Sequence, residues 1–412
     1  MEQKPKGITN GDVCFPFSHL KKISHIYYPF RNVSMYFLNG DRIYINPEKA
    51  CGTMDEQLEN CFAQLSKINS GQKIFKLSFF AETNSKAGYE QLQNKIRNKI
   101  KNQFSYEVIT TLIAQPPLSS KIIVEACFYR EKDWDAKFIK GESSGAVLFK
   151  RDNAEILIGS AQAYSNYAIK INTEKAFAEL IDIFNEAYFP INAIVRQWNY
   201  VENILGFDGE SQRYQEFNDV RSGVYGNTFT EKGYPSATGI GMNQGGVIIE
   251  FIAVKSGDLI SFPIDNPNQI SAHTYSEKVL VGAECVLKTT PKFERARFIE
   301  LFGKKLIFVS GTASIVGEKT VGVGNAEEQT EVTINNIKQL YSPEVLENLT
   351  GAALNPQYGH ARVYVKNKRD YSVIRKTFKR HFGSLPVVYI IADICRDDLL
   401  VEIEGKVILE KS

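Results

Sequence analysis

Cysteine and histidine are scarce in this sequence, and neither is spaced as it usually is in zinc-binding or disulfide-stabilised domains. The chain has six cysteines without a CxxC pair and five histidines without paired spacing. These spacings indicate neither a structural zinc site nor a disulfide framework. We therefore predict reduced thiols and no metal.

Long apolar runs and an excess of charge of one sign are absent as well. No run of about 18 apolar residues suggests a membrane span, and the first residues lack the apolar stretch of a signal peptide. The 49 basic and 47 acidic residues leave a net charge of +2, so no electrostatic field favours nucleic acid or a membrane surface. We expect a cytoplasmic protein that acts on a small molecule.

The chain does have length and a recurring pattern of elements. Its 412 residues suffice for two or three domains, each with its own core. The C-terminal part is predicted to run strand, helix, strand, helix, strand, strand, because β-branched and amphipathic segments alternate there. These elements are expected at residues 305–317, 325–340, 361–365, 371–381 and 387–395 and around residue 402.

The same order begins upstream near residue 156. Gly311 follows Gly159 by 152 residues, and Glu402 follows Glu250 by 152 as well, so the two copies match without net insertion. A weaker third copy is predicted earlier in the chain. Its expected elements are a strand at 76–80, a helix at 89–100 and a strand with a glutamate at 122–126.

We accordingly divide the chain into three parts. Residues 1–140 form an N-terminal region that is a partial or divergent module, residues 141–260 a first full module, and residues 261–412 a C-terminal module. Sites are expected between modules, where ligand pockets commonly lie. Internal repeats favour a pseudo-trimeric monomer, whereas exposed sheet edges favour a homo-oligomer, and both readings stay open.

The last predicted strand places one carboxylate, Glu402, among alternating apolar residues. Burial there would disfavour the charged form and raise the pKa, which suits a general acid. The alternative is a solvent-facing glutamate on an edge strand, since glutamate is rarely fully buried.

A set of motifs follows one order along residues 145–410. They are VRQWNY (195–200), RYQEFNDVR (213–221), YPSATGIG (234–241), NPNQISA (266–272), FERA (293–296), FVSGTAS (308–314) and ADICR (392–396), followed by Glu402. Together they resemble the chorismatase family of the 3-hydroxybenzoate synthase type, also known as pteridine-dependent-dioxygenase-like, within the YjgF/RidA-like superfamily. The resemblance implies tandem α/β (α+β) modules of the chorismate-mutase-like kind, with mixed sheets packed by helices.

The resemblance also implies a reaction. Chorismatases cleave chorismate and release pyruvate from its enolpyruvyl ether, a chemistry that requires no cofactor. By resemblance Glu402 is the acid that protonates the ether. A cysteine at the position of Cys395 accompanies the type that forms 3-hydroxybenzoate, and a smaller alanine accompanies the hydrolytic type, which forms a dihydroxycyclohexadiene carboxylate. Ala313 is a second position that can tune the outcome.

Chorismate carries two carboxylates, so its pocket needs fixed cations and neutral donors. The candidates in the family motifs are Arg196, Arg213, Arg221, Arg295, Tyr214 and Tyr275. We place Tyr275 and Arg295 first and expect at least one arginine to be structural. Ser310 and Thr312 can donate to the substrate, or they satisfy local backbone groups instead.

Two other functions compete with this one. Imine deaminases of the RidA type use an arginine in the strand before the closing turn, and the corresponding residues 385–391 contain none, which argues against that activity. The third reading is a ligand-binding or scaffold protein that keeps the fold without catalysis.

Overall fold

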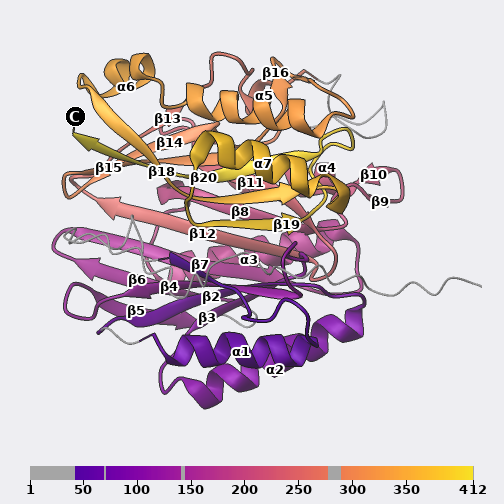
Figure 1. Ribbon diagram of the computed structural model, residues 1–412. Helices are drawn as coiled ribbons and strands as arrows, with labels where there is room; N and C mark the ends of the chain where they lie inside the picture. Colours follow the sequence, from indigo (N-terminus) through magenta and orange to yellow (C-terminus); the bar gives the residue numbers. More distant parts are fainter. Residues whose placement is uncertain (1–41, 69–70, 141–143, 277–288, 412) are drawn as a thin grey trace, which may run out of the picture.

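The computed structural model describes residues 42–68, 71–140, 144–276 and 289–411 (Figure 1). Most of its strands belong to three sheets, and helices cover one face of each. Helices α1 and α2 lie at one end of the molecule and α5 and α7 at the other, with the sheets between them (Figure 1). No helix within these ranges is long and apolar enough to cross a membrane.

The first sheet has the strand order β1-β4-β2-β3, in which β4 is antiparallel to both neighbours and β3 is parallel to β2. Helix α1 begins at a capping box of Thr53 and Glu56, and α2 begins at the N-cap Ser85. The elements are β1 (Arg42–Ile45), α1 (Met54–Ser66), β2 (Lys73–Ala81), α2 (Lys86–Gln103), β3 (Ile109–Ile113) and β4 (Ile122–Tyr129).

The second sheet has the order β11-β8-β12-β7-β6-β5, and β11 is parallel to β8. Its elements are β5 (Asp135–Lys140), β6 (Gly145–Arg151), β7 (Ala154–Ala163), α3 (Ile169–Glu186), β8 (Ile194–Glu202), α4 (Arg213–Tyr225), β11 (Ser236–Met242) and β12 (Val247–Ser256). A short hairpin of β9 (Phe207–Asp208) and β10 (Ser211–Gln212) precedes α4. Because β5 pairs with β6, this sheet begins before the boundary predicted at residue 141.

The third sheet has the order β13-β14-β15-β20-β18-β19, and β19 is parallel to β18. Its elements are β13 (Ile260–Ile264), β14 (Ala296–Leu301), β15 (Lys304–Ala313), α5 (Ala326–Gln339), α6 (Pro343–Thr350), β18 (Leu354–Val365), α7 (Tyr371–Phe382), β19 (Val387–Ile391) and β20 (Val401–Lys411). A small hairpin of β16 (Ile315–Val316) and β17 (Lys319–Thr320) follows β15.

One topology is repeated in all three sheets. The last strand of each, which we call the closing strand (β4, β12 or β20), lies between two antiparallel neighbours, and an edge strand runs parallel to one of them. The predicted fold class of tandem modules with mixed sheets packed by helices is therefore confirmed.

The sheets turn their helix-free faces toward one another. One apolar cluster includes Phe80, Tyr200 and Tyr364 from the three sheets, whereas two further clusters lie between the second and third sheets and their own helices. Buried ion pairs join the sheets in a cycle. They are Glu125 with Arg362, Glu250 with Lys76, and Glu404 with Arg196. This cycle makes the interior pseudo-threefold.

Two expectations from the sequence need correction. The strand predicted to reach residue 395 ends at Ile391, because the chain then leaves the sheet and Ile394 forms a bridge with Ile240 of β11. Cys51 is disulfide-bonded, whereas Cys61, Cys127 and Cys395 are free. Wide spacing along the chain therefore did not mean that every thiol is reduced.

Candidate active site

Glu402 lies in β20, opposite Ala313 of β15 and Tyr364 of β18. Its neighbours in sequence, Val401 and Ile403, pack toward the helices, so alternation along the strand turns Glu402 toward the other modules. The residue is 4% exposed. The prediction that this carboxylate lies inside an apolar strand is confirmed, and the solvent-facing alternative is wrong.

Burial and the neighbouring Glu404 raise the pKa of Glu402 to about 8, although Arg196 acts in the opposite direction. Within the described ranges its carboxyl has no hydrogen-bond or ion-pair partner. A carboxylic acid in this state keeps its proton at neutral pH.

Gly311 leaves the space that the Glu402 carboxyl occupies. A β carbon at residue 311 would lie 2.0 Å from Glu402 Oε1 and 3.2 Å from Thr238 Cγ2. The glycine sits where the pairing of β15 with β20 shifts register, between Val309 and Thr312. Such bulges often reposition side chains beside active sites.

Cys395 lies at the junction of the second and third modules. The segment that carries it is fixed by the amide of Gly241, which donates to the carbonyl of Asp393 at 2.8 Å. The cysteine packs against the central apolar cluster and against the cluster of the second module. Burial, together with the charge of Glu402, raises the pKa of its thiol to about 12, so the group is a neutral thiol.

Tyr214, in the first turn of α4, completes this side of the site. Its ring packs on Gly239, where a β carbon would approach the ring to 3.0 Å. Burial raises the pKa of Tyr214, and Cys395 and Glu402, which lie nearby, act in the same direction once they are ionised. The phenol is therefore a neutral hydrogen-bond donor close to both residues.

Arg295 and Tyr275, the first two candidates for substrate binding, are in contact. Arg295 Nη2 donates to the hydroxyl of Tyr275 at 2.5 Å and to the carbonyl of Ile270 at 2.6 Å. Its Nε–H is buried without a partner. No carboxylate of the described residues lies within ion-pairing distance of this guanidinium, so its charge is available to an anionic ligand.

Arg221, on α4, is a second buried arginine of this kind. It is 1% exposed, its Nη2 donates to Asn218 Oδ1 at 2.6 Å, and its Nε has no partner. It too lacks a carboxylate partner in the part of the chain that the structure describes. Buried arginines are normally paired, so two without acids indicate a binding site for an anion.

Other predicted residues have structural partners instead. Arg196 is ion-paired with Glu404, and Arg213 is paired with Asp208 at 2.9 Å. The Ser310 hydroxyl donates to the carbonyl of Glu294 at 2.6 Å and accepts from the amide of Ala237 at 2.9 Å. The Thr312 hydroxyl donates to the carbonyl of Ser310 at 2.9 Å. Each of these groups therefore has a partner within the protein.

Arg396 was missed by the sequence reasoning, although it belongs to the ADICR motif. Its guanidinium lies 5.3 Å from the centre of the Tyr275 ring, and its Nη1 donates to the carbonyl of Glu318 at 2.7 Å. It also lines an open cleft of about 580 Å³ with Phe207, Gln212 and Glu318. The cleft therefore adjoins the site from the solvent side.

The described residues contain no cluster of three or more His, Cys, Asp or Glu side chains that would hold a metal ion. The site instead combines one neutral carboxylic acid, a neutral thiol, two phenols and two buried arginines. They come from the second and third modules, as expected for a site between repeats.

Comparisons with known proteins identify relatives of this chain. Residues 134–253 match the family model described as chorismatase FkbO/Hyg5-like, N-terminal. A chorismatase from Streptomyces rapamycinicus is 30% identical over 284 residues, which are 66% of this chain and 81% of the relative. A 3-hydroxybenzoate synthase from Streptomyces hygroscopicus is 29% identical over 247 residues, 57% of this chain and 68% of the relative. A chorismatase crystal structure, 20% identical, has a TM-score of 0.65 over 89% of this chain and 98% of that one, which shows a shared fold.

Proposed function

The chain belongs to the chorismatase family, and we propose that it cleaves chorismate to pyruvate and 3-hydroxybenzoate, with Glu402 as the general acid. The observation that carries this proposal is the buried, unpaired carboxyl of Glu402, whose pKa is raised to about 8. A general acid works best when its pKa lies near the operating pH.

The hard step is protonation of the enolpyruvyl ether. The Glu402 proton would go to the methylene carbon of the vinyl ether, which becomes the methyl group of pyruvate, and the ether carbon becomes an oxocarbenium ion. The carboxylate left on Glu402 is then a negative charge beside this cation, which favours the transition state. Gly311 and Ala313 border the carboxyl with little bulk.

Recognition of the substrate carboxylates is assigned in this proposal to Arg295 and Arg221. Each guanidinium is buried and has no acid partner in the described ranges, and a planar guanidinium suits bidentate binding of a carboxylate. Tyr275 and Tyr214 are the neutral donors that complete the pocket, since burial keeps Tyr214 protonated.

Cys395 is assigned to the choice of product. Its neutral thiol lies near both Glu402 and Tyr214, where its bulk would keep water from the cation. Exclusion of water favours attack by the neighbouring ring hydroxyl on the ring carbon that carries the ether. The bond from this carbon to the ether oxygen breaks, that oxygen leaves as the carbonyl of pyruvate, and the hydroxyl proton returns to the Glu402 carboxylate. The arene oxide formed then rearranges to 3-hydroxybenzoate. Addition of water instead gives the dihydroxycyclohexadiene carboxylate.

Cys395→Ala is expected to raise the share of the dihydroxycyclohexadiene carboxylate among the products, because the smaller side chain admits water. Chromatography of the products beside a pyruvate assay measures the ratio. Cys61→Ala is the matched control, since that free thiol lies in the first module. An unchanged product ratio in Cys395→Ala would remove this residue from the mechanism.

The rate should depend on pH in a defined direction. Because Glu402 must be protonated to act and its pKa is about 8, kcat/KM is expected to fall as the pH rises through this value. The profile measured between roughly pH 6 and pH 10 tests it. A rate that stays constant, or that rises across this range, would mean that Glu402 acts as a base or not at all.

The proposal is tested by incubating the purified chain with chorismate. Pyruvate with 3-hydroxybenzoate supports it, and pyruvate with the non-aromatic diol points to the hydrolytic type. Imine deaminase activity is disfavoured because β19, like the residues just before it, has no arginine. No pyruvate above the uncatalysed background would favour a non-catalytic binding protein.

A further inference from the structure

The three closing strands carry glutamates at equivalent positions. In each sheet one residue of the closing strand faces a buried cation on the neighbouring strand, which is β2, β8 or β18. Glu125, Glu250 and Glu402 each lie two residues before that residue. Those facing pairs are Cys127 with Lys76, Ile252 with Arg196, and Glu404 with Arg362. The equivalence follows from strand register alone, and it allows the surroundings of the three carboxyls to be compared directly.

The first two glutamates are neutralised by the cation of a neighbouring sheet. Arg362 holds Glu125 with three hydrogen bonds of 2.8–3.1 Å, and Lys76 Nζ lies 2.7 Å from Glu250 Oε1. Burial alone would raise the pKa of Glu125, but Arg362, Arg42 and Lys76 lower it to about 2. The pKa of Glu250 is lowered as well, because Lys76 and Arg362 outweigh its burial.

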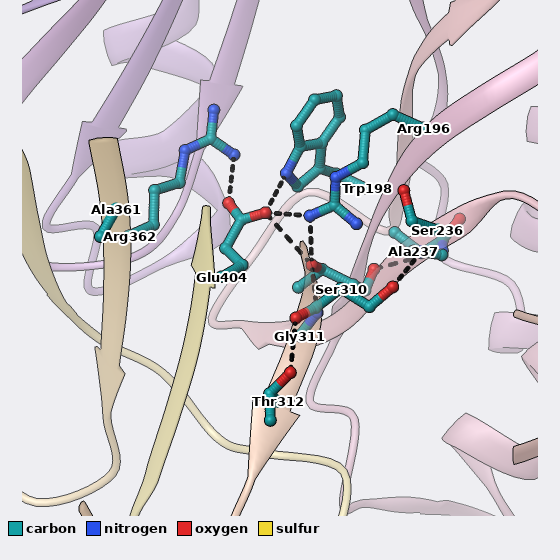
Figure 2. Close-up of polar contacts among 12 residues, drawn as sticks. Arg196, Trp198, Ser236, Ala237, Ser310, Gly311, Thr312, Ala361, Arg362 and Glu404 are labelled. Atoms are coloured by element: carbon teal, nitrogen blue, oxygen red, sulfur yellow. Dashed lines mark hydrogen bonds and ion pairs between the residues drawn. The ribbon is translucent and has the colours of Figure 1, made fainter. Parts of the chain in front are cut away.

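The third position breaks the pattern. By the same symmetry Arg196 is the cation for Glu402, but it is bound to Glu404 (Figure 2). The Glu404 carboxylate also accepts from Trp198 Nε1 at 2.6 Å and from Thr238 Oγ1 at 3.3 Å, and Arg362 Nη1 lies 3.3 Å from it. It is therefore saturated with donors.

Glu404 occurs where the other two closing strands have an uncharged side chain. Cys127 and Ile252 stand at this register position in the first and second sheets, and neither can hold a guanidinium. In those sheets the cation of the neighbouring module is left to the glutamate two residues earlier. In the third sheet the additional carboxylate, Glu404, binds this cation instead.

We propose that Glu404 is a positioning residue that withholds Arg196 from Glu402, so that this one carboxyl of three equivalent ones stays a neutral acid. The inference rests on the proposed function, because it explains how the acid of that reaction is kept protonated. Arg196 belongs to the second module and Glu404 to the third. The way in which these modules pack together therefore sets the acidity of Glu402.

Several titratable groups lie on the elements packed around Glu402. They are Glu404 on β20, Arg196 on β8, Tyr364 and Arg362 on β18, Tyr214 and Arg221 on α4, and Cys395 with the nearby Arg396 and Arg295. Burial keeps Tyr364, Tyr214 and Cys395 neutral. Arg362 is paired with Glu125, and Arg221, Arg295 and Arg396 act on Tyr214 and Cys395. Glu404 and Arg196 are the charges that act most strongly on Glu402.

Arg196 is able to serve a second carboxylate. Its Nη2 is bound to Glu404 and donates to Thr238 Oγ1 at 2.7 Å, whereas its Nη1 is buried without a partner among the described residues. The guanidinium is thus held away from Glu402 by its attachment to Glu404, and not by a lack of free donors.

Glu404→Gln tests the inference. Loss of the anion and release of Arg196 both stabilise the ionised form of Glu402, so its pKa is expected to fall by about 1–3 units. The decline of kcat/KM should move to lower pH by the same amount, with activity recovered in acid. An equal loss of activity at every pH, with an unmoved midpoint, would show that Glu404 is merely structural and would overturn the inference.

The double variant Arg196→Gln/Glu404→Gln is the matched control. It removes both Arg196 and the charge of Glu404, so burial alone acts on the pKa of Glu402. The midpoint of the pH dependence of kcat/KM should then return toward the wild-type value. A midpoint as low as that of Glu404→Gln would show that Arg196 is not the carrier of the effect.

A readout without substrate separates this inference from the proposed reaction. The infrared band of the protonated carboxyl of Glu402, identified by its loss in Glu402→Gln, reports the pKa of this group directly. If the band shifts as expected in Glu404→Gln while chorismate is not cleaved, the charge arrangement stands and the proposed reaction fails. An unmoved band overturns the inference whatever the activity.

Discussion

Glu402→Gln is expected to lower the rate of pyruvate release from chorismate by about 10²–10⁴-fold, the usual contribution of a general acid. The amide has nearly the shape of the protonated carboxyl but cannot deliver its proton. Because Glu402 has no ion-pair partner in the described ranges, the substitution leaves no buried charge uncompensated. The fold should therefore be retained, and a melting temperature close to that of the wild type checks this.

Glu410→Gln is the control for this change. Glu410 lies near the end of the same strand, β20, and its side chain is exposed, so its replacement should alter neither rate nor stability. If Glu402→Gln keeps a rate close to that of the wild type, Glu402 is not the acid.

Gly311→Ala is expected to lower the rate by about 10²-fold without unfolding the protein. The new methyl group would lie 2.0 Å from Glu402 Oε1, so the carboxyl must move. The end of a glutamate side chain moves at little cost in stability, but displacement of a catalytic group by about 1 Å is enough for a loss of this size. The loss should appear mainly in kcat, because Arg221 and Arg295 are untouched.

The control is Gly359→Ala, which adds a methyl group to β18 of the same sheet. That methyl would meet the flexible Ile408 side chain at 3.1 Å, away from Glu402. Similar melting temperatures for both variants, with a rate loss confined to Gly311→Ala, would support the placement of the carboxyl. An active Gly311→Ala variant would contradict it.

The sequence contained enough to predict the repeat and its most important side chain. The constant spacing from Gly159 to Gly311 and from Glu250 to Glu402 indicated equivalent modules, and the structure confirms the topology. Glu402 was identifiable because a carboxylate interrupts an apolar strand. Arg196 was a candidate only as a member of the VRQWNY motif, and nothing near it in the sequence connects it with Glu404.

What the sequence did not indicate depends on contacts between modules. Arg196 and Glu404 are 208 residues apart, and Arg362 and Glu125 are 237 residues apart. Such partners follow from how whole sheets dock, which no local pattern encodes. The same limit applies to Ser310, whose hydroxyl accepts a hydrogen bond from the amide of Ala237 in the second module.

The protonation state of Glu402 in the free enzyme is the central claim, and infrared titration of the wild type against Glu402→Gln measures it most directly. A protonated-carboxyl band is expected at about pH 7, and it should disappear with a midpoint near 8. Absence of this band at about pH 7, with a midpoint near the ordinary glutamate value of about 4.3, would show an ionised carboxylate and contradict the assignment of Glu402 as the acid.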